Sequence, residues 1–173
     1  MYREEKSTSP LTIIIRIAMV LGGLILGFVI SRAFIIPYKV AGDSMSPNFN
    51  AGKRIFILKH TTPHFGDIVL MRSPVISGKV FIKRIIGVAG DSIEIKNQVI
   101  YRNNDKLRLN WKTAKKDQRN LPMSFSFRDT MPLVKLFRNE YFVINDNLDD
   151  SYDSRTFGKI QKDLIIGRFL YSF

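Results

Sequence analysis

The sequence contains no cysteine, and its 173 residues include only two histidines. The absence of cysteine excludes disulfides, thiolate zinc sites and a cysteine nucleophile. The two histidines, His60 and His64, are separated by Pro63, which argues against a helix that would bring them to one face. No third ligand stands nearby in the sequence, so we expect no metal site. A Ser-His-Asp triad would have to use one of these two loop residues.

Acidic residues are also few, because 15 Asp and Glu stand against 27 Lys and Arg, a net charge of +12. Such a charge favours nucleic acid, acidic protein or phospholipid headgroups as partners. Basic residues are dense from about residue 103 to 139, where we predict an insertion between two core strands. Aromatic residues alternate with them there. One hypothesis is therefore a non-catalytic, membrane-tethered β domain that binds nucleic acid or acidic lipid.

One long apolar run is present, LTIIIRIAMVLGGLILGFVI, in which Arg16 is the only charge. About 20 apolar residues span a bilayer as a helix. We therefore predict a transmembrane helix over residues 11–31, between a short tail of residues 1–10 and a body of residues 32–173. The flanking charges do not choose its orientation. A cleaved signal peptide is the alternative, because Ser31-Arg32-Ala33 has the small-x-small pattern of a cleavage site.

The body lacks any long stretch with helical periodicity. Short runs rich in Val, Ile and Phe alternate with Gly, Pro, Asn and Asp, which are strand and turn signals. The runs are IIPYKV, RIFILK, DIVLMR, KVFIKRIIGV, SIEIKNQVIYR, EYFVIND and IIGRFLYSF. Their spacing predicts an all-β sandwich or barrel.

Two segments of the body carry a candidate nucleophile and a candidate base. In VAGDSMSP, Ser44 lies between glycine and proline on a predicted turn. A serine hydroxyl is a poor nucleophile until a neighbouring base removes its proton. In KVFIKRIIG, strand alternation puts Phe81, Lys83 and Ile85 on one face, where desolvation would lower the pKa of the lysine. A general base near neutrality needs the ordinary lysine pKa of about 10.4 lowered by roughly 2–3 units. Taken alone, a turn serine and a solvated lysine are the simpler interpretations.

A third segment, FVINDNLDDSYDSRTFG, is dense in short acids, amides and hydroxyls. Such side chains bond to the backbone and order irregular loops. A calcium loop is the rival hypothesis, but the acids lack the EF-hand spacing and its central glycine.

Together these segments resemble the bacterial type I signal peptidases, also called leader peptidases. GDSMSP resembles the nucleophile block of that family, FGDIVLMR the following strand block, and FIKRIIGVAGD the lysine block. NDNLDDSYDSRTFG resembles the last block, usually written GDNRDNSxDSRxxG. The four blocks occur in the family's order behind one apolar span.

The resemblance implies an all-β catalytic domain with a small inserted β subdomain, behind one N-terminal transmembrane helix. It implies a membrane-bound serine endopeptidase that removes signal peptides from exported preproteins after a small-x-small motif such as Ala-x-Ala. The expected location is the bacterial cytoplasmic membrane, with residues 32–173 on the extracytoplasmic (periplasmic) side and residues 1–10 in the cytoplasm. Signal peptides and the phospholipid membrane are the expected partners. No nucleic acid, metal or organic cofactor is implied.

The same resemblance assigns roles to residues. Ser44 would attack the scissile carbonyl and form an acyl-enzyme, with neutral Lys83 as general base. Ser151 would orient the lysine, while Asp153 and Arg155 would pair to hold the loop behind the site. Asp146 would also support the dyad. The three residues expected beside the substrate or the oxyanion are Met45, Gly42 and Asp43.

Several positions depart from the family pattern. Asn145 replaces a glycine close to the expected lysine, where it would either hydrogen-bond the amine or crowd it. Leu148 replaces an arginine and Asp150 an asparagine, while Gly42 has no hydroxyl for an oxyanion. Two nearby classes stay open, a conjugation-pilus processing peptidase and a self-cleaving repressor-type protease. The latter normally carries a DNA-binding domain, where this chain has its apolar span.

Overall fold

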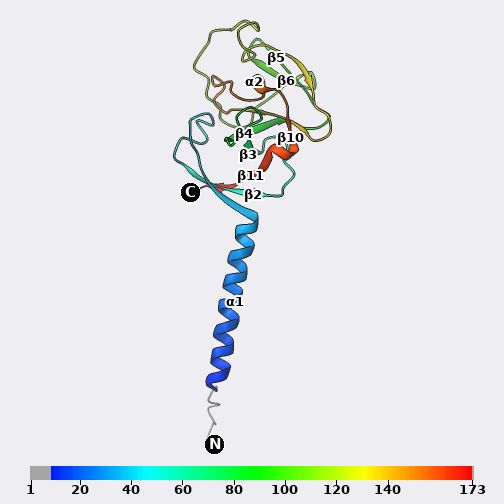
Figure 1. The fold of residues 1–173 in the computed structure, drawn as a ribbon. Helices are drawn as coiled ribbons and strands as arrows, with labels where there is room; N and C mark the ends of the chain where they lie inside the picture. The colour runs from blue at the N-terminus through cyan, green and yellow to red at the C-terminus, as the bar shows by residue number, and fades with distance from the viewer. Residues whose placement is uncertain (1–8, 173) are drawn as a thin grey trace, which may run out of the picture. The chain divides into compact units, whose positions relative to one another are not determined.

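The computed structural model describes residues 9–172 and begins with a single helix, α1 (Pro10–Phe34), drawn in blue in Figure 1. Within the described range, α1 is the one helix long and apolar enough to cross a membrane, with a mean hydropathy of 2.6. It contains the whole run predicted to span the bilayer. The predicted tail, residues 1–10, lies almost entirely outside the described residues.

The described residues from 36 to 172 form a separate compact unit whose regular elements are mostly strands. Its larger sheet has the order β1-β2-β11-β3-β4-β9-β10. The bounds in that order are Ile35–Lys39, Arg54–Lys59, Ile165–Ser172, Ile68–Arg72, Val80–Gly87, Glu140–Ile144 and Ile160–Gln161. From β2 to β10 all neighbouring strands pair antiparallel. A short helix, α2 (Ser154–Phe157), and a 3₁₀ turn, η1 (Lys162–Leu164), lie between β9 and β11 in the sequence.

A second, smaller sheet is inserted between β4 and β9, which are neighbours in the larger sheet. Its order is β7-β6-β5-β8, with bounds Asp105–Lys106, Val99–Arg102, Ser92–Lys96 and Met131–Lys135. Figure 1 shows β5 and β6 together, apart from β2 and β11. The predicted all-β body with a small inserted β subdomain is therefore confirmed. The inserted sheet begins at β5, before the basic stretch from which the insertion was predicted.

The strands at the centre of the larger sheet are buried on both faces. Every residue of β9 is buried, and so are the last six of the eight residues of β4. Ile82 packs into one hydrophobic cluster with Met45, whereas Ile85 packs into another with Val143. Because β4 has protein on both sides, the two basic side chains in its middle, at positions 83 and 84, are also buried.

Candidate active site

The candidate nucleophile lies on the loop between β1 and β2. Backbone bonding closes this loop at its base, where the Val40 N–H donates to the Lys53 carbonyl at 2.9 Å. The side chains of Met45 and Phe49 are buried in the hydrophobic core and anchor the loop from within. Ser44 precedes Met45 and is half-buried, so its hydroxyl lies at the boundary between the core and solvent. The turn lies where the sequence predicts one, and the three residues before Ser44 are exposed.

A small hollow of about 60 Å³ opens beside Ser44. Ser44 and Met45 line it from the loop, while Val80, Phe81 and Ile82 line it from β4. Ser44 therefore shares a hollow with the residues that immediately precede Lys83 on its strand.

The Lys83 side chain is buried, with 2% of its surface exposed. Its Nζ donates a hydrogen bond of 2.5 Å to Asn145 Oδ1 and lies 5.1 Å from the centroid of the Phe81 ring. Val69 is its partner on β3. No hydrogen bond within residues 9–172 joins Lys83 Nζ to Ser44 Oγ. Catalytic hydrogen bonds are often long in a free enzyme and tighten when substrate binds.

The electrostatic surroundings of Lys83 lower its pKa below the ordinary lysine value. Burial is the main cause, because the charged form loses its hydration. The negative charges of Asp153 and Asp150 oppose this lowering, and the positive charge of Arg155 adds to it. The net direction favours the neutral amine, which is the form that a general base requires.

Arg84 points to the opposite face of β4, where each of its three side-chain nitrogens donates a hydrogen bond. Its Nε and Nη2 donate to the two carboxylate oxygens of Asp146 at 2.6 and 2.7 Å. Its Nη1 donates to the Gly66 carbonyl at 2.8 Å, and its guanidinium stacks over the Trp111 ring at 4.5 Å. Asp146 is fully buried. This pair fixes the start of the loop after β9.

The loop after β9 is held by Asp153 and Arg155, the two residues that were expected to pair there. Arg155 Nε and Nη2 donate to Asp153 at 2.9 and 2.7 Å, and both side chains are buried. Asp153 also accepts from the Asn145 backbone N–H at 2.9 Å and caps α2. The pair therefore ties α2 back to the residue that contacts Lys83.

Two hydrogen bonds join this loop to the nucleophile loop. The Asn147 N–H donates to the Ser44 carbonyl at 2.9 Å, and Asn48 Nδ2 donates to Asp146 Oδ2 at 2.7 Å. From the insertion, the Ala114 N–H donates to the Asp146 carbonyl at 3.0 Å. Ser44 is thereby placed beside the loop that carries Asn145.

The other predicted site residues have varied surroundings. Ser151 is half-buried, and its backbone carbonyl accepts from Thr156 Oγ1 at 2.5 Å, while no described residue bonds its hydroxyl. Asp43 accepts from the Ala51 N–H at 3.0 Å, which braces the nucleophile loop. Gly42 is exposed beside open space. The roles expected for Ser151, Met45, Gly42 and Asp43 stay predictions.

Sequence reasoning missed the pairing of Arg84 with Asp146, although it assigned Asp146 a supporting role. The two residues are 62 positions apart. The available signal was the alternation of β4, which puts Arg84 on the face opposite Lys83, but no local pattern names its partner.

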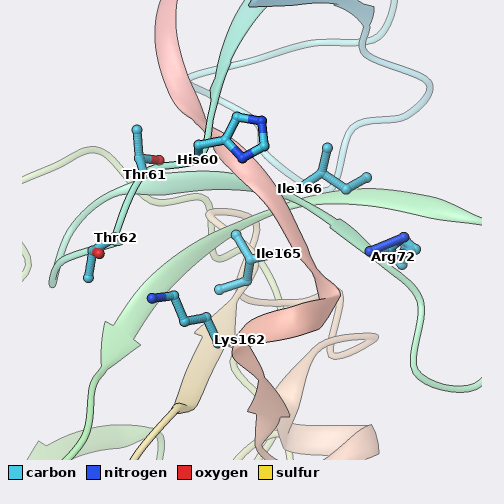
Figure 2. A pocket seen from close by; sticks show the side chains of 7 residues that line it. All are labelled: His60, Thr61, Thr62, Arg72, Lys162, Ile165 and Ile166. Carbon is cyan, nitrogen blue, oxygen red and sulfur yellow. The ribbon is translucent and has the colours of Figure 1, made fainter. Parts of the chain in front are cut away.

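A larger cavity of about 610 Å³ lies at the ends of β2 and β3 and beside the start of β11. Figure 2 shows its lining side chains, among them Thr61, Arg72 and Lys162. The Thr61 hydroxyl donates to the Leu58 carbonyl at 3.4 Å. The charged residues of the lining, Arg72 and Lys162, are exposed. Neither Ser44 nor Lys83 lines it. Among residues 9–172 no three His, Asp or Glu side chains gather as metal ligands.

The chain matches known proteins over nearly its whole length. The family described as "Signal peptidase, peptidase S26" matches residues 11–173. Signal peptidase I V of Bacillus subtilis (strain 168) is 34% identical over 151 residues, covering 83% of this chain and 89% of that protein. Signal peptidase IB of Staphylococcus aureus (strain Mu50) is 30% identical over 157 residues, covering 84% and 81%. A signal peptidase I structure from Enterococcus faecalis V583 is 24% identical with a TM-score of 0.48, covering 64% of this chain and 98% of that one.

The family match includes both the apolar helix and the β body, so the chain belongs to the signal peptidase family, peptidase S26. The prediction of a type I signal peptidase, and with it of a serine protease, is confirmed by the family and by these two relatives.

Proposed function

We propose that this signal peptidase cleaves by a Ser44–Lys83 dyad. The observation that carries the proposal is the buried amine of Lys83, whose burial lowers its pKa, on the strand that lines the hollow beside Ser44. A neutral amine can accept the proton that a serine hydroxyl must lose to become a nucleophile. His60 and His64 line no part of the hollow that holds Ser44.

The reaction then proceeds in two halves. As Ser44 Oγ bonds to the scissile carbonyl carbon, its proton passes to Lys83 Nζ, which later gives that proton to the leaving amine as the peptide bond breaks. Water then attacks the acyl ester and loses a proton to Lys83 Nζ. When the ester bond breaks, the lysine returns that proton to Ser44 Oγ. The Ser44 backbone N–H, which has no acceptor among the described residues, is the expected oxyanion donor, a contact worth about 3–4 kcal/mol.

The hollow beside Ser44 supports a preference for small side chains next to the scissile bond. A volume of about 60 Å³ suits a small side chain such as a methyl or hydroxymethyl group. β1 is an outer strand of the larger sheet and leads directly into the nucleophile loop. A preprotein bound as an added strand there would present alternate side chains to the enzyme, which suits a small-x-small motif.

The expected setting is the bacterial cytoplasmic membrane, with α1 as a single span and the β body on the extracytoplasmic side. The length and composition of α1 support the span. The sidedness follows from the proposed substrate, because the signal peptide of an exported preprotein is removed where the mature chain emerges.

The proposal is tested by cleavage of a preprotein with the full chain in detergent micelles. Ser44→Ala and Lys83→Ala should each lower kcat/KM by about 10³-fold or more, because residues of a dyad act as a unit. Ser77→Ala and Lys79→Ala, exposed positions before β4, are matched controls and should cleave like the wild type. Substantial cleavage by either dyad variant would rule out the assignment.

A further inference from the structure

Asn145 immediately follows β9, the strand that pairs with β4 beside Lys83. Arg84 pairs with Ile144 and Ile85 with Val143 between β4 and β9. One further step along this antiparallel ladder brings Lys83 opposite Asn145. Side chains in such pairs are close enough to interact directly, and the hydrogen bond of 2.5 Å from Lys83 Nζ to Asn145 Oδ1 is the result. Asn145 has no exposed surface. Of the two sequence-based expectations, hydrogen bonding or crowding, the structure shows the hydrogen bond.

The orientation of the Asn145 amide is set by its second partner. Asn145 Nδ2 donates to the Asp150 carbonyl at 2.8 Å, and a carbonyl can only accept. The amide oxygen must therefore face Lys83. The Asp150 carbonyl also accepts from Arg155 Nη2 at 2.7 Å. The Asn145 backbone N–H donates to Asp153. The amide is consequently held at its backbone and at its nitrogen, with its oxygen left for the lysine.

We propose that Asn145 is a positioning residue for the general base, whose amide oxygen holds Lys83 Nζ in the free enzyme. The inference rests on the proposed role of Lys83. Both an ammonium and an amine have N–H groups to donate, so the contact survives a change in protonation. Proton transfer from Ser44 requires the amine lone pair, which an acceptor such as Oδ1 leaves available. Asn145 thus fixes the lysine without occupying the site that must take the proton.

A neutral acceptor at position 145 also sets how basic the lysine is. The charged groups that act on Lys83 are Asp153, Asp150 and Arg155, all from the loop after β9. Asp153 is already paired with Arg155. From β3 the lysine faces Val69, and from its own strand the Phe81 ring, so neither neighbouring surface supplies a further charge. A carboxylate in place of the amide would put an anion at hydrogen-bonding distance from Lys83 Nζ and would stabilise the ammonium.

The test is Asn145→Asp, with Asn104→Asp as the matched control on the exposed turn between β6 and β7. Two pH midpoints are measured on the full chain in micelles. They are the acidic limb of kcat/KM and the titration of Lys83 itself, followed by NMR of ¹³Cε-labelled lysine and assigned with Lys83→Arg. Asn145→Asp should raise both midpoints by at least about one unit, lowering kcat/KM about tenfold below the midpoint. Asn104→Asp should leave both unchanged. An Asn145→Asp enzyme with wild-type midpoints would overturn the inference.

A second variant removes the acceptor instead of charging it. Asn145→Ala should lower kcat by roughly 10- to 100-fold while KM changes little, because a misplaced catalytic group costs rate rather than substrate binding. Ser151→Ala, which removes the hydroxyl predicted to orient the lysine, should cost less. A larger loss for Ser151→Ala than for Asn145→Ala would assign the positioning role to Ser151 and overturn the inference.

The outcomes separate the inference from the function on which it rests. If Asn145→Asp moves the titration of Lys83 but not the kcat/KM profile, the general-base assignment is wrong. If Lys83→Ala abolishes cleavage while Asn145→Asp moves neither midpoint, the dyad stands and the positioning role is wrong.

Discussion

Lys83 and Arg84 are consecutive residues of β4, and both side chains are buried. They point to opposite faces of the strand and have different partners there. Arg84 meets the carboxylate of Asp146 with two hydrogen bonds, bonds a backbone carbonyl and stacks on Trp111. Lys83 has one neutral hydrogen-bond acceptor, Asn145, beside the apolar side chains of Val69 and Phe81, and no carboxylate among the described residues bonds it directly.

The difference separates a structural cation from a reactive one. A buried charge is tolerated when a counter-charge and further hydrogen bonds replace its water, as they do for Arg84. When a buried amine has no directly bonded carboxylate, burial lowers its pKa, as it does for Lys83. The Arg84 face holds the loop after β9 in place, and the Lys83 face uses that loop to present a neutral base.

The largest loss of stability is expected when the buried Arg84–Asp146 pair is broken. Arg84→Met leaves the buried carboxylate of Asp146 without its cation, and removing one partner of a buried pair costs about 3–5 kcal/mol of unfolding free energy. Urea unfolding of the full chain in micelles, followed by far-UV circular dichroism, measures the loss. The double variant Arg84→Met/Asp146→Leu should recover much of it. A loss below about 1 kcal/mol in the single variant would contradict this account.

A smaller loss of stability is expected when Lys83, on the opposite face of β4, is replaced by methionine. Lys83→Met abolishes the proposed base and leaves the buried Asn145 Oδ1 without its donor, so the free energy of unfolding should fall by about 1–3 kcal/mol. The same unfolding experiment gives the comparison. A loss as large as that of Arg84→Met would show that Lys83 is a structural cation too.

The smallest effect is expected from replacing Phe81, whose ring contacts the Lys83 amine. An aromatic face stabilises an ammonium by about 0.5–1 kcal/mol, so Phe81→Leu should lower the pKa of Lys83 by roughly half a unit. The acidic limb of kcat/KM should then move to lower pH. Phe137→Leu is the matched control, because Lys159 lies 4.9 Å from that ring at the other end of β9. A shift to higher pH in Phe81→Leu would contradict the expected role of the ring.

The sequence predicted the strands and the alternation of β4 because both are local patterns. Runs of Val, Ile and Phe mark the strands, and period-two alternation puts Lys83 on the face of Phe81 and Ile85. The burial of Lys83 decides against the solvated lysine that the sequence left open. The partners of Lys83 and Arg84 were not predictable in the same way, because each lies 62 positions away and depends on the register of β4 with β9.

The smaller sheet includes strands that precede the basic stretch, and the sequence does not distinguish them for a physical reason. The composition of the sequence changes only where the basic residues begin. β5 and β6 lie before that point and resemble the preceding core strands in composition. Only pairing assigns these two strands to the smaller sheet.

The central claim, that Lys83 is a neutral base in the folded enzyme, is tested most directly by titrating its side chain in the wild-type full chain by ¹³C NMR. A folded-state pKa below the unfolded one means that the amine loses its proton at lower pH, so kcat/KM rises with pH through that midpoint. We expect a Lys83 pKa well below about 10.4 that coincides with the midpoint of the acidic limb of kcat/KM. A Lys83 that titrates at or above its ordinary value would contradict it.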